Sequence, residues 1–228
     1  MTAVAMLACN LLSGGPALAP AIPTAEQSPA SPILENLTCT PPCWNGIVPG
    51  QTLKQDTLDL LNGIKTEKDE IAIKEIGDAE SVITLYLHIS GKMISDVQQR
   101  INFMVVNDLV QEIYFEGELS TDLDQAIDTL GEPEGVINLP YPVELLLLYP
   151  SKGIILFPEP FSNNSLVDRD TLKPESTILK MIFFDPANWD ATIGENLVER
   201  SVIDKYMVPW DEYGVIDEKY PEPDWFGK

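Results

Sequence analysis

Two cysteines separated by three residues form the pattern that most directly suggests chemistry: Cys39 and Cys43, in Cys-Thr-Pro-Pro-Cys-Trp. Redox catalysis would require two intervening residues and a strand that leads into a helix, whereas three residues, two of them prolines, lie between these cysteines. A metal site would need further ligands, and the single histidine, His88, is distant in sequence. We therefore expect Cys39 and Cys43 to form a structural disulfide, the default in an oxidising compartment.

Acidic side chains and His88 are the remaining candidates for catalysis. A hydrolytic triad needs a base oriented by a carboxylate, and no Gly-x-Ser-x-Gly elbow accompanies His88. The pairs Asp122/Asp124 and Asp168/Asp170 carry groups that could act in acid–base catalysis or bind calcium. The second pair lacks the glycine and distal glutamate of a calcium loop, and among 36 acidic residues close pairs arise by chance. We expect no catalytic residue, no metal and no cofactor.

The charge of the chain restricts its partners. It contains 36 acidic and 14 basic residues, which gives a formal net charge of −22. Such a surface repels the phosphates of nucleic acids and anionic lipid headgroups, so we expect neither as a partner, whereas a basic partner is compatible. The acidic character continues through residues 185–228, a segment that also contains seven aromatic residues. A disordered acidic tail has fewer aromatics, and we expect this segment to pack on the body of the protein.

The N-terminal segment, residues 1–19, has the composition of an export signal. Its apolar run, residues 3–12, is too short to cross a bilayer, which takes about 20 residues, but it has the length of the hydrophobic region of a signal peptide. In one interpretation Met6-Leu7-Ala8-Cys9 is a lipobox and Cys9 is lipidated. In another, cleavage after Ala17-Leu18-Ala19 removes Cys9 with the leader. A buried N-terminal strand is the third interpretation.

Residues 20–34 are rich in proline, alanine and serine, a composition that behaves as an extended tether. A tether that follows a lipid-bearing Cys9 is what a surface lipoprotein requires, which favours the lipobox. We therefore expect an extracytoplasmic protein, either a cell-surface lipoprotein or a secreted protein. Its only contact with a membrane would be through the lipid on Cys9.

The rest of the chain reads as two copies of one unit, residues 35–117 and 118–190, followed by residues 191–228. In each unit a segment with helix-capping signals precedes three strand-like runs. The expected helices cover residues 53–62, 121–130 and 193–206, and the expected strands cover 81–89, 101–106, 109–115, 143–149, 153–157 and 178–184. The predicted fold is α+β: two tandem units of a helix plus a three-stranded antiparallel sheet, with a C-terminal helix and an aromatic acidic tail. A polar insertion, residues 158–177, separates the last two strands.

Two short motifs and the strand triplets carry a resemblance to known proteins. Gly50-Gln51-Thr52 opens the first helix, and Leu130-Gly131-Glu132-Pro133 closes the second. With these motifs, the repeated unit resembles the fold of beta-lactamase inhibitory proteins and of the small assembly lipoproteins of the bacterial outer membrane. The segment from Cys39 to Gly50 also resembles a group of exported proteins from Chloroflexus-type bacteria. The resemblance implies a binding scaffold that uses a sheet face or loops, because a fold alone does not fix a task.

Strand alternation in the first unit indicates which side chains lie opposite the core. The isoleucines and leucines of residues 81–89 share one face, and tyrosines on the opposite, exposed face are typical of recognition surfaces. In the alternative, the C-terminal segment covers that face with Trp189 or Trp210. The second unit is apolar on both faces over residues 145–148, so we expect its sheet to be covered on both sides. The candidate binding residues on the first unit's face are Thr84, Tyr86, His88, Glu112 and Tyr114.

These features favour a non-enzymatic binding module that is exported, with or without a lipid anchor, and that engages another envelope or secreted protein. The tether, the disulfide, the tandem scaffold and the lack of a catalytic constellation all point to it. One alternative is an inhibitor of a secreted enzyme, acting through the sheet face or through residues 158–177. A second alternative is a hydrolase that depends on carboxylates or a metal, which would need a concave pocket with convergent carboxylates.

Overall fold

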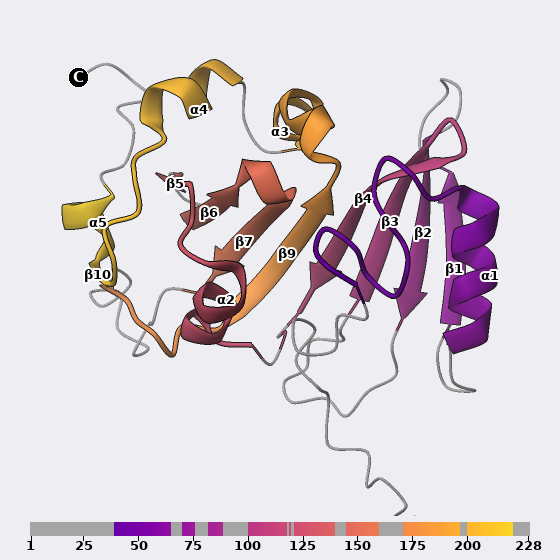
Figure 1. Ribbon diagram of the computed structural model, residues 1–228, viewed down its shortest axis with the longest axis horizontal. Coiled ribbons are helices and arrows are strands. Elements are labelled where there is room, and N and C mark those ends of the chain that lie inside the picture. Colours follow the sequence, from indigo (N-terminus) through magenta and orange to yellow (C-terminus); the bar gives the residue numbers. More distant parts are fainter. Residues whose placement is uncertain are drawn as a thin grey trace, which may run out of the picture.

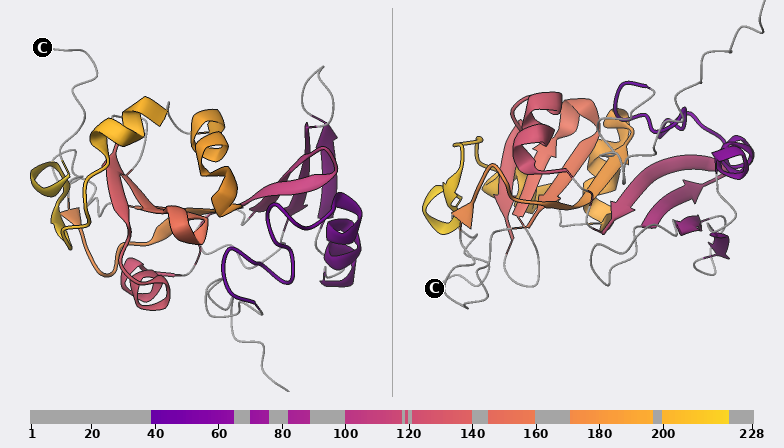
Figure 2. Two further views of the ribbon diagram at one scale, coloured as in Figure 1. Left: turned by 45° about the horizontal axis from the view of Figure 1, so that its top comes forward. Right: turned by 90° about the horizontal axis from the view of Figure 1, so that it is seen from below.

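The computed structural model describes residues 39–64, 70–75, 82–88, 100–117, 119, 121–139, 145–159, 171–196 and 200–220. Within these residues the chain forms one large antiparallel β-sheet with helices on both of its faces (Figures 1 and 2). The α+β class expected from the sequence is confirmed.

The described strands of the large sheet number eight, in the order β1-β2-β3-β4-β9-β7-β6-β5. Neighbouring strands are antiparallel throughout this sheet. The chain thus contributes β1 to β4 to one half and β5, β6, β7 and β9 to the other, one strand more in each half than expected. The strands are β1 Glu70–Glu75, β2 Val82–His88, β3 Arg100–Val106, β4 Leu109–Glu116, β5 Gly135–Asn138, β6 Leu145–Tyr149, β7 Ile154–Pro158 and β9 Ile178–Phe184.

The helices divide between the two faces of the sheet (Figure 2). Helices α1 and α2 lie on one face, where they cover one buried cluster. Helices α3 and α4 lie on the other face and cover a second cluster over β5, β6, β7 and β9. A small sheet of β8 and β10 and a short helix, α5, complete the described fold. The bounds are α1 Lys54–Ile64, α2 Leu123–Leu130, α3 Trp189–Asn196, α4 Arg200–Tyr206, α5 Ile216–Lys219, β8 Thr171–Leu172 and β10 Gly214–Val215.

Local sequence explains where α2 begins and ends. The side chain of Asp122 accepts a hydrogen bond from the backbone N–H of Gln125 at 2.8 Å, which satisfies one free donor of the first turn. Asp122 is therefore the N-cap of the helix expected over residues 121–130. Gly131 ends the helix at φ 80° while its N–H donates to the carbonyl of Ile127 at 2.7 Å, a backbone conformation that glycine adopts without strain.

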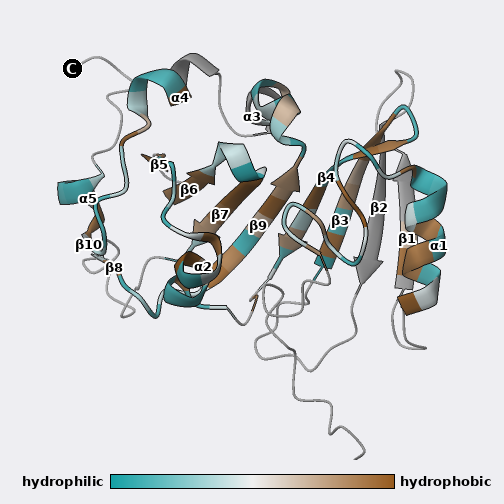
Figure 3. Ribbon diagram, viewed as in Figure 1, coloured by the Kyte–Doolittle hydropathy of each residue, from teal (hydrophilic) through white to brown (hydrophobic). Residues whose placement is uncertain are grey.

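The two faces of the sheet hold separate apolar cores. On the α1/α2 face, Phe103, Phe115 and Phe183 are fully buried, and the rings of Phe115 and Phe183 meet edge to face at 5.1 Å. On the α3/α4 face, Ile182 and Phe184 are fully buried beneath Ile203 of α4. Each such side chain contributes about 1.5–3 kcal/mol when it leaves water. Figure 3 accordingly shows β7 and β9 as mostly hydrophobic, and the expectation that this half is covered on both sides is confirmed.

The described part of the C-terminal segment, up to residue 220, packs on the body of the protein, as its aromatic content indicated. Tyr220 is fully buried, and its carbonyl accepts a hydrogen bond from Asn138 Nδ2 at 2.8 Å. Trp210 stacks on Tyr220 at a centroid distance of 6.0 Å on the α1/α2 side, whereas Trp189 packs on Phe184 on the other side. Where a single helix was expected over residues 193–206, the described residues form two, α3 up to Asn196 and α4 from Arg200.

Candidate functional site

The centre of the sheet is a boundary between an apolar and a polar surface. Tyr114 of β4 pairs with Ile182 of β9 on one side and with Asn102 of β3 on the other. From Ile182 outwards, this face is apolar except for Lys180 of β9, and its apolar side chains are buried under α3 and α4. From Tyr114 outwards, across β4 and β3, the same face carries Asn102, Glu112, Glu116 and Arg100.

Hydrogen bonds organise these polar side chains into pairs. The hydroxyl of Tyr114 donates to Glu112 Oε2, and Nδ2 of Asn102 donates to Glu116 Oε2 at 3.1 Å. Lys180 of β9 pairs in register with Glu116 and places its Nζ 4.6 Å from the ring centroid of Phe157 and 5.7 Å from that of Tyr114. Cation–π attraction operates at these distances. The polar face is therefore a connected set of a phenol, an amide, two carboxylates and an ammonium group.

Burial separates the supporting side chains from the accessible ones. Glu112 is 1% exposed and Asn102 is 9% exposed, while Tyr114 and Glu116 are partly exposed and Arg100 is exposed. The expectation that Glu112 lies on the exposed surface is therefore wrong. The alternation of the strand assigned Glu112 to the correct face of the sheet. Neighbouring groups nevertheless enclose its side chain, and its carboxylate accepts a hydrogen bond from the Tyr114 hydroxyl. Within the described residues, Oδ1 of Asn102 has no hydrogen-bond partner.

The other three candidate residues lie in β2, next to this face. The register pairs Thr84 with Met104, Tyr86 with Asn102 and His88 with Arg100. The backbone therefore aligns them with the positions of β3 that lie on this face, while their side chains lie outside the described part of the structure. Four residues of the face were missed in the sequence. The alternation of polar and apolar residues over 100–104 could have indicated Arg100 and Asn102. Glu116 and Lys180 could not be recognised in this way, because they become neighbours only when β4 pairs with β9. The missed residues are Arg100, Asn102, Glu116 and Lys180.

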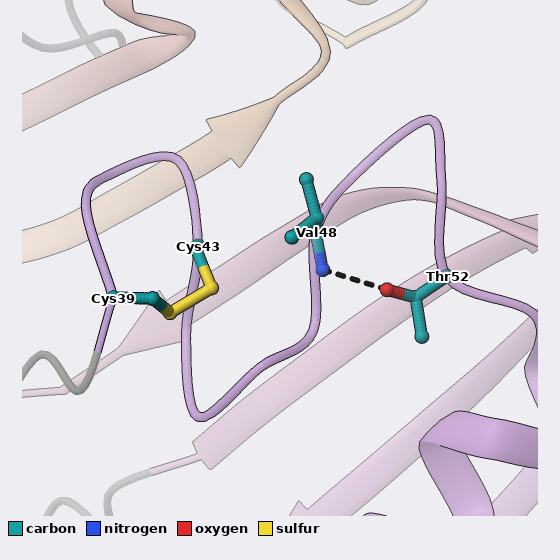
Figure 4. The surroundings of a disulfide bond; sticks show 4 residues. All are labelled: Cys39, Cys43, Val48 and Thr52. Carbon is teal, nitrogen blue, oxygen red and sulfur yellow. Dashed lines mark hydrogen bonds between the residues drawn. A yellow bond between two sulfur atoms is a disulfide. The ribbon is translucent and has the colours of Figure 1, made fainter.

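Cys39 and Cys43 form the expected disulfide, with their Cα atoms 5.6 Å apart (Figure 4). The adjacent Trp44 packs against Phe103 at 5.8 Å and Phe115 at 5.9 Å, so the cysteine loop is anchored on the α1/α2 core. Cys43 is 6% exposed. Cys39 is partly exposed.

The acidic pair Asp122/Asp124 has structural contacts. Asp122 caps α2, and Asp124 Oδ1 accepts a hydrogen bond from the hydroxyl of Tyr213 at 2.9 Å. Asp168, Asp170 and Cys9 lie outside the described residues. In the part of the chain that the structure covers, no three His, Cys, Asp or Glu side chains group as metal ligands. None of the helices described there is long and apolar enough to cross a membrane.

Three tyrosines lie around the C-terminal segment. Tyr149 is fully buried, and burial raises the pKa of its hydroxyl, which has no hydrogen-bond partner among the described residues. Burial also raises the pKa of Tyr213 and brings that of Tyr220 to about 12. The Tyr220 hydroxyl accepts from the N–H of Asp211 at 2.9 Å and donates to the carbonyl of Glu212 at 2.8 Å. These phenols therefore remain neutral at physiological pH and serve as packing groups.

Comparison with known proteins adds no assignment. No model of a protein family matches the chain, and no curated protein or solved structure is significantly similar to it.

Proposed function

We propose that this protein is an exported binding module that engages another envelope or secreted protein through the polar face of β2, β3 and β4. The observation that carries the proposal is the change of surface at the Tyr114–Ile182 pair. One half of this sheet face lies under α3 and α4, and no described element covers the other half. In that half Tyr114 and Glu116 are partly exposed and Arg100 is exposed.

The side chains of this face suit protein recognition. Tyrosine and arginine are enriched at the energetic centres of protein interfaces. Glu112 holds the Tyr114 hydroxyl in place, so less side-chain freedom is lost on binding. The formal charge of −22 favours a partner with a basic contact surface, because opposite potentials steer the encounter.

A location outside the cytoplasm is part of the same proposal. The Cys39–Cys43 disulfide supports it, because disulfides persist in oxidising compartments and are rare in the cytosol. The export-signal composition of residues 1–19 and the tether of residues 20–34 support it as well. The protein is held at the surface by a lipid on Cys9, or it is released after removal of the leader.

A tandem duplication is the architecture that we propose for the scaffold. In each unit, three backbone hydrogen bonds join the start of the helix to the strand region that follows it in the sheet. Corresponding residues of the two units are 69 positions apart at the helix start and 68 positions apart in the strand region. β-Bulges also recur, because Gln111 of β4 and Leu179 of β9, again 68 residues apart, are skipped in the pairing. The recurring bonds are Gly50 N to Val110 O, Val110 N to Thr52 O and Lys54 N to Asp108 O, and Leu119 N to Ile178 O, Ile178 N to Thr121 O and Leu123 N to Ser176 O.

Affinity capture tests the binding function. The tagged full-length protein and its Tyr114→Ala variant are incubated with envelope and culture-fluid fractions of the native organism, and bound proteins are identified by mass spectrometry. We expect one stoichiometric partner that the variant retains at least tenfold less well. Glu218→Ala, an exposed change far from this face, is the matched control. Equal capture by all three proteins would exclude the polar face, and capture of a secreted enzyme would favour an inhibitor.

A further inference from the structure

The two outer edges of the large sheet differ in how they end. At one end, β5 is paired on its outer side, because Val136 and Val208 exchange two backbone hydrogen bonds of 2.8 and 2.9 Å. At the other end, no described residue pairs with the outer edge of β1. An edge strand with free N–H and C=O groups is a template for another strand.

We propose that two copies of this chain join through their β1 strands, edge to edge and antiparallel, to form a symmetric dimer. A twofold axis perpendicular to the sheet relates two such strands, and the sheet continues from one copy into the other. The chain already contains a junction of this kind, where β4 and β9 join antiparallel about the Tyr114–Ile182 pair.

The sequence of β1 selects one register for this junction. Facing residues must lie on the same face of the sheet, so one residue of β1 must face its own copy, and the axis passes midway between these two copies. With the axis at Ala72, Glu70 of each copy lies opposite Lys74 of the other, and Ile71 lies opposite Ile73. Moving the axis to Ile71 or to Ile73 places Ala72 opposite a charged residue and leaves no pair of opposite charges. Opposite charges directly across two strands stabilise their pairing.

Helix α1 supplies a second contact at the same end of the molecule. Figures 1 and 2 place α1 beside β1, and Ile71 packs against the core cluster that includes Leu61 of α1. Leu60 and Ile64, one turn apart on α1, remain 37% and 44% exposed. The proposed axis keeps both α1 helices on the same side of the extended sheet, flanking the junction. Association then covers apolar surface that a monomer leaves in water.

Charge also favours this end. The whole chain has 36 acidic and 14 basic residues, whereas residues 53–75 have six acidic residues and four lysines. Two copies with a formal charge of −22 each repel one another, but residues 53–75 contribute only −2 of that charge, so this end adds little to the repulsion.

Charge reversal at the junction tests this dimer and separates a loss of dimerisation from a loss of folding. The full-length protein is expected to sediment at twice the 25.2 kDa of one chain. Glu70→Lys and Lys74→Glu each place like charges across the junction, and each variant is expected to dissociate at least tenfold more readily. An equimolar mixture of the two variants restores both opposite-charge pairs and is expected to sediment as a dimer, a result that a local folding defect would not produce. Circular dichroism of each variant checks its fold.

A cysteine at the axis gives a second measurement. Facing residues of antiparallel strands have Cα atoms about 4.5–5.5 Å apart, within disulfide reach. In a Cys9→Ser background, Ala72→Cys is expected to oxidise to a covalent dimer, and Met207→Cys, at the other end of the sheet, is not. A monomeric wild-type protein, single-charge variants that dimerise as the wild type does, a mixture that stays monomeric, or equal cross-linking at both positions would each overturn the proposal.

Discussion

Tyr114 and Ile182 face each other across the junction of β4 and β9, and they divide one face of the sheet into a polar and an apolar half. Both residues lie in strands whose opposite faces build one continuous core, where Phe115 and Phe183 are in contact. The division therefore arises from side chains on one face only, while the backbone of the sheet is continuous. A polar surface and a packed core thus share the same strands.

The hydroxyl of Tyr114 should stabilise the fold through Glu112. Tyr114→Phe keeps the ring but removes the hydrogen bond to a carboxylate that is 1% exposed. A buried acceptor that loses a donor costs about 1–3 kcal/mol, and urea unfolding should show a loss of that size. Tyr213→Phe is the matched control, because its partner Asp124 is exposed, and its loss should be smaller. Equal losses in the two variants would contradict the role given to Glu112.

Gly50 should tolerate no side chain. Its φ of +76° disfavours other residues, and a Cβ there would lie 2.8 Å from the Cβ of Asp185, whose carboxylate accepts from the N–H of Ala187. Gly46 has a similar φ of +86° but open space around it. Gly46→Ala should cost about 1–2 kcal/mol from backbone strain alone, and Gly50→Ala should cost about 1 kcal/mol more because the Asp185 carboxylate is displaced from its hydrogen bond with the N–H of Ala187. Urea unfolding of both variants measures the difference.

The disulfide should contribute modestly to stability. It closes a loop from Cys39 to Cys43, and chain entropy for so short a loop amounts to about 2 kcal/mol. The double variant Cys39→Ala/Cys43→Ala should therefore remain folded but unfold at a lower urea concentration. Trp44→Ala should cost more, about 3–5 kcal/mol, because it opens a cavity against Phe103 and Phe115. A disulfide variant less stable than Trp44→Ala would contradict this ranking.

Tyr220 should make the protein sensitive to alkali. Burial raises its pKa to about 12 in the folded chain, against about 10 in the unfolded chain. Its contribution to stability is fully present below pH 10 and is lost as the pH rises from 10 to 12, because only the unfolded chain then releases the proton. Tyr220→Phe should be less stable at pH 7, where two hydrogen bonds are lost, and its free energy of unfolding should fall less steeply above pH 10. Urea unfolding at several pH values tests both effects.

Strong hydrophobic runs made most of the strands predictable. The run at residues 178–184 coincides with β9, Ile178–Phe184. In contrast, β1 was missed because Glu-Ile-Ala-Ile-Lys-Glu has charged ends, and β5 was missed because Gly-Val-Ile-Asn is short. The face of Glu112 followed from alternation, but its burial depends on neighbours that alternation does not identify. The pairing of β4 with β9 rests on backbone hydrogen bonds, which any residue can make, so no local pattern encodes it.

The cluster under α2 draws side chains from both ends of the described chain, since Trp44 and Tyr220 belong to the same core. No fragment that stops before the final helix can therefore complete that core. During synthesis, which starts at the N-terminus, Trp44 emerges long before Tyr220, and the core they share is complete only when both are present. Such a delay couples tight packing of this cluster to the arrival of the segment that carries Tyr220.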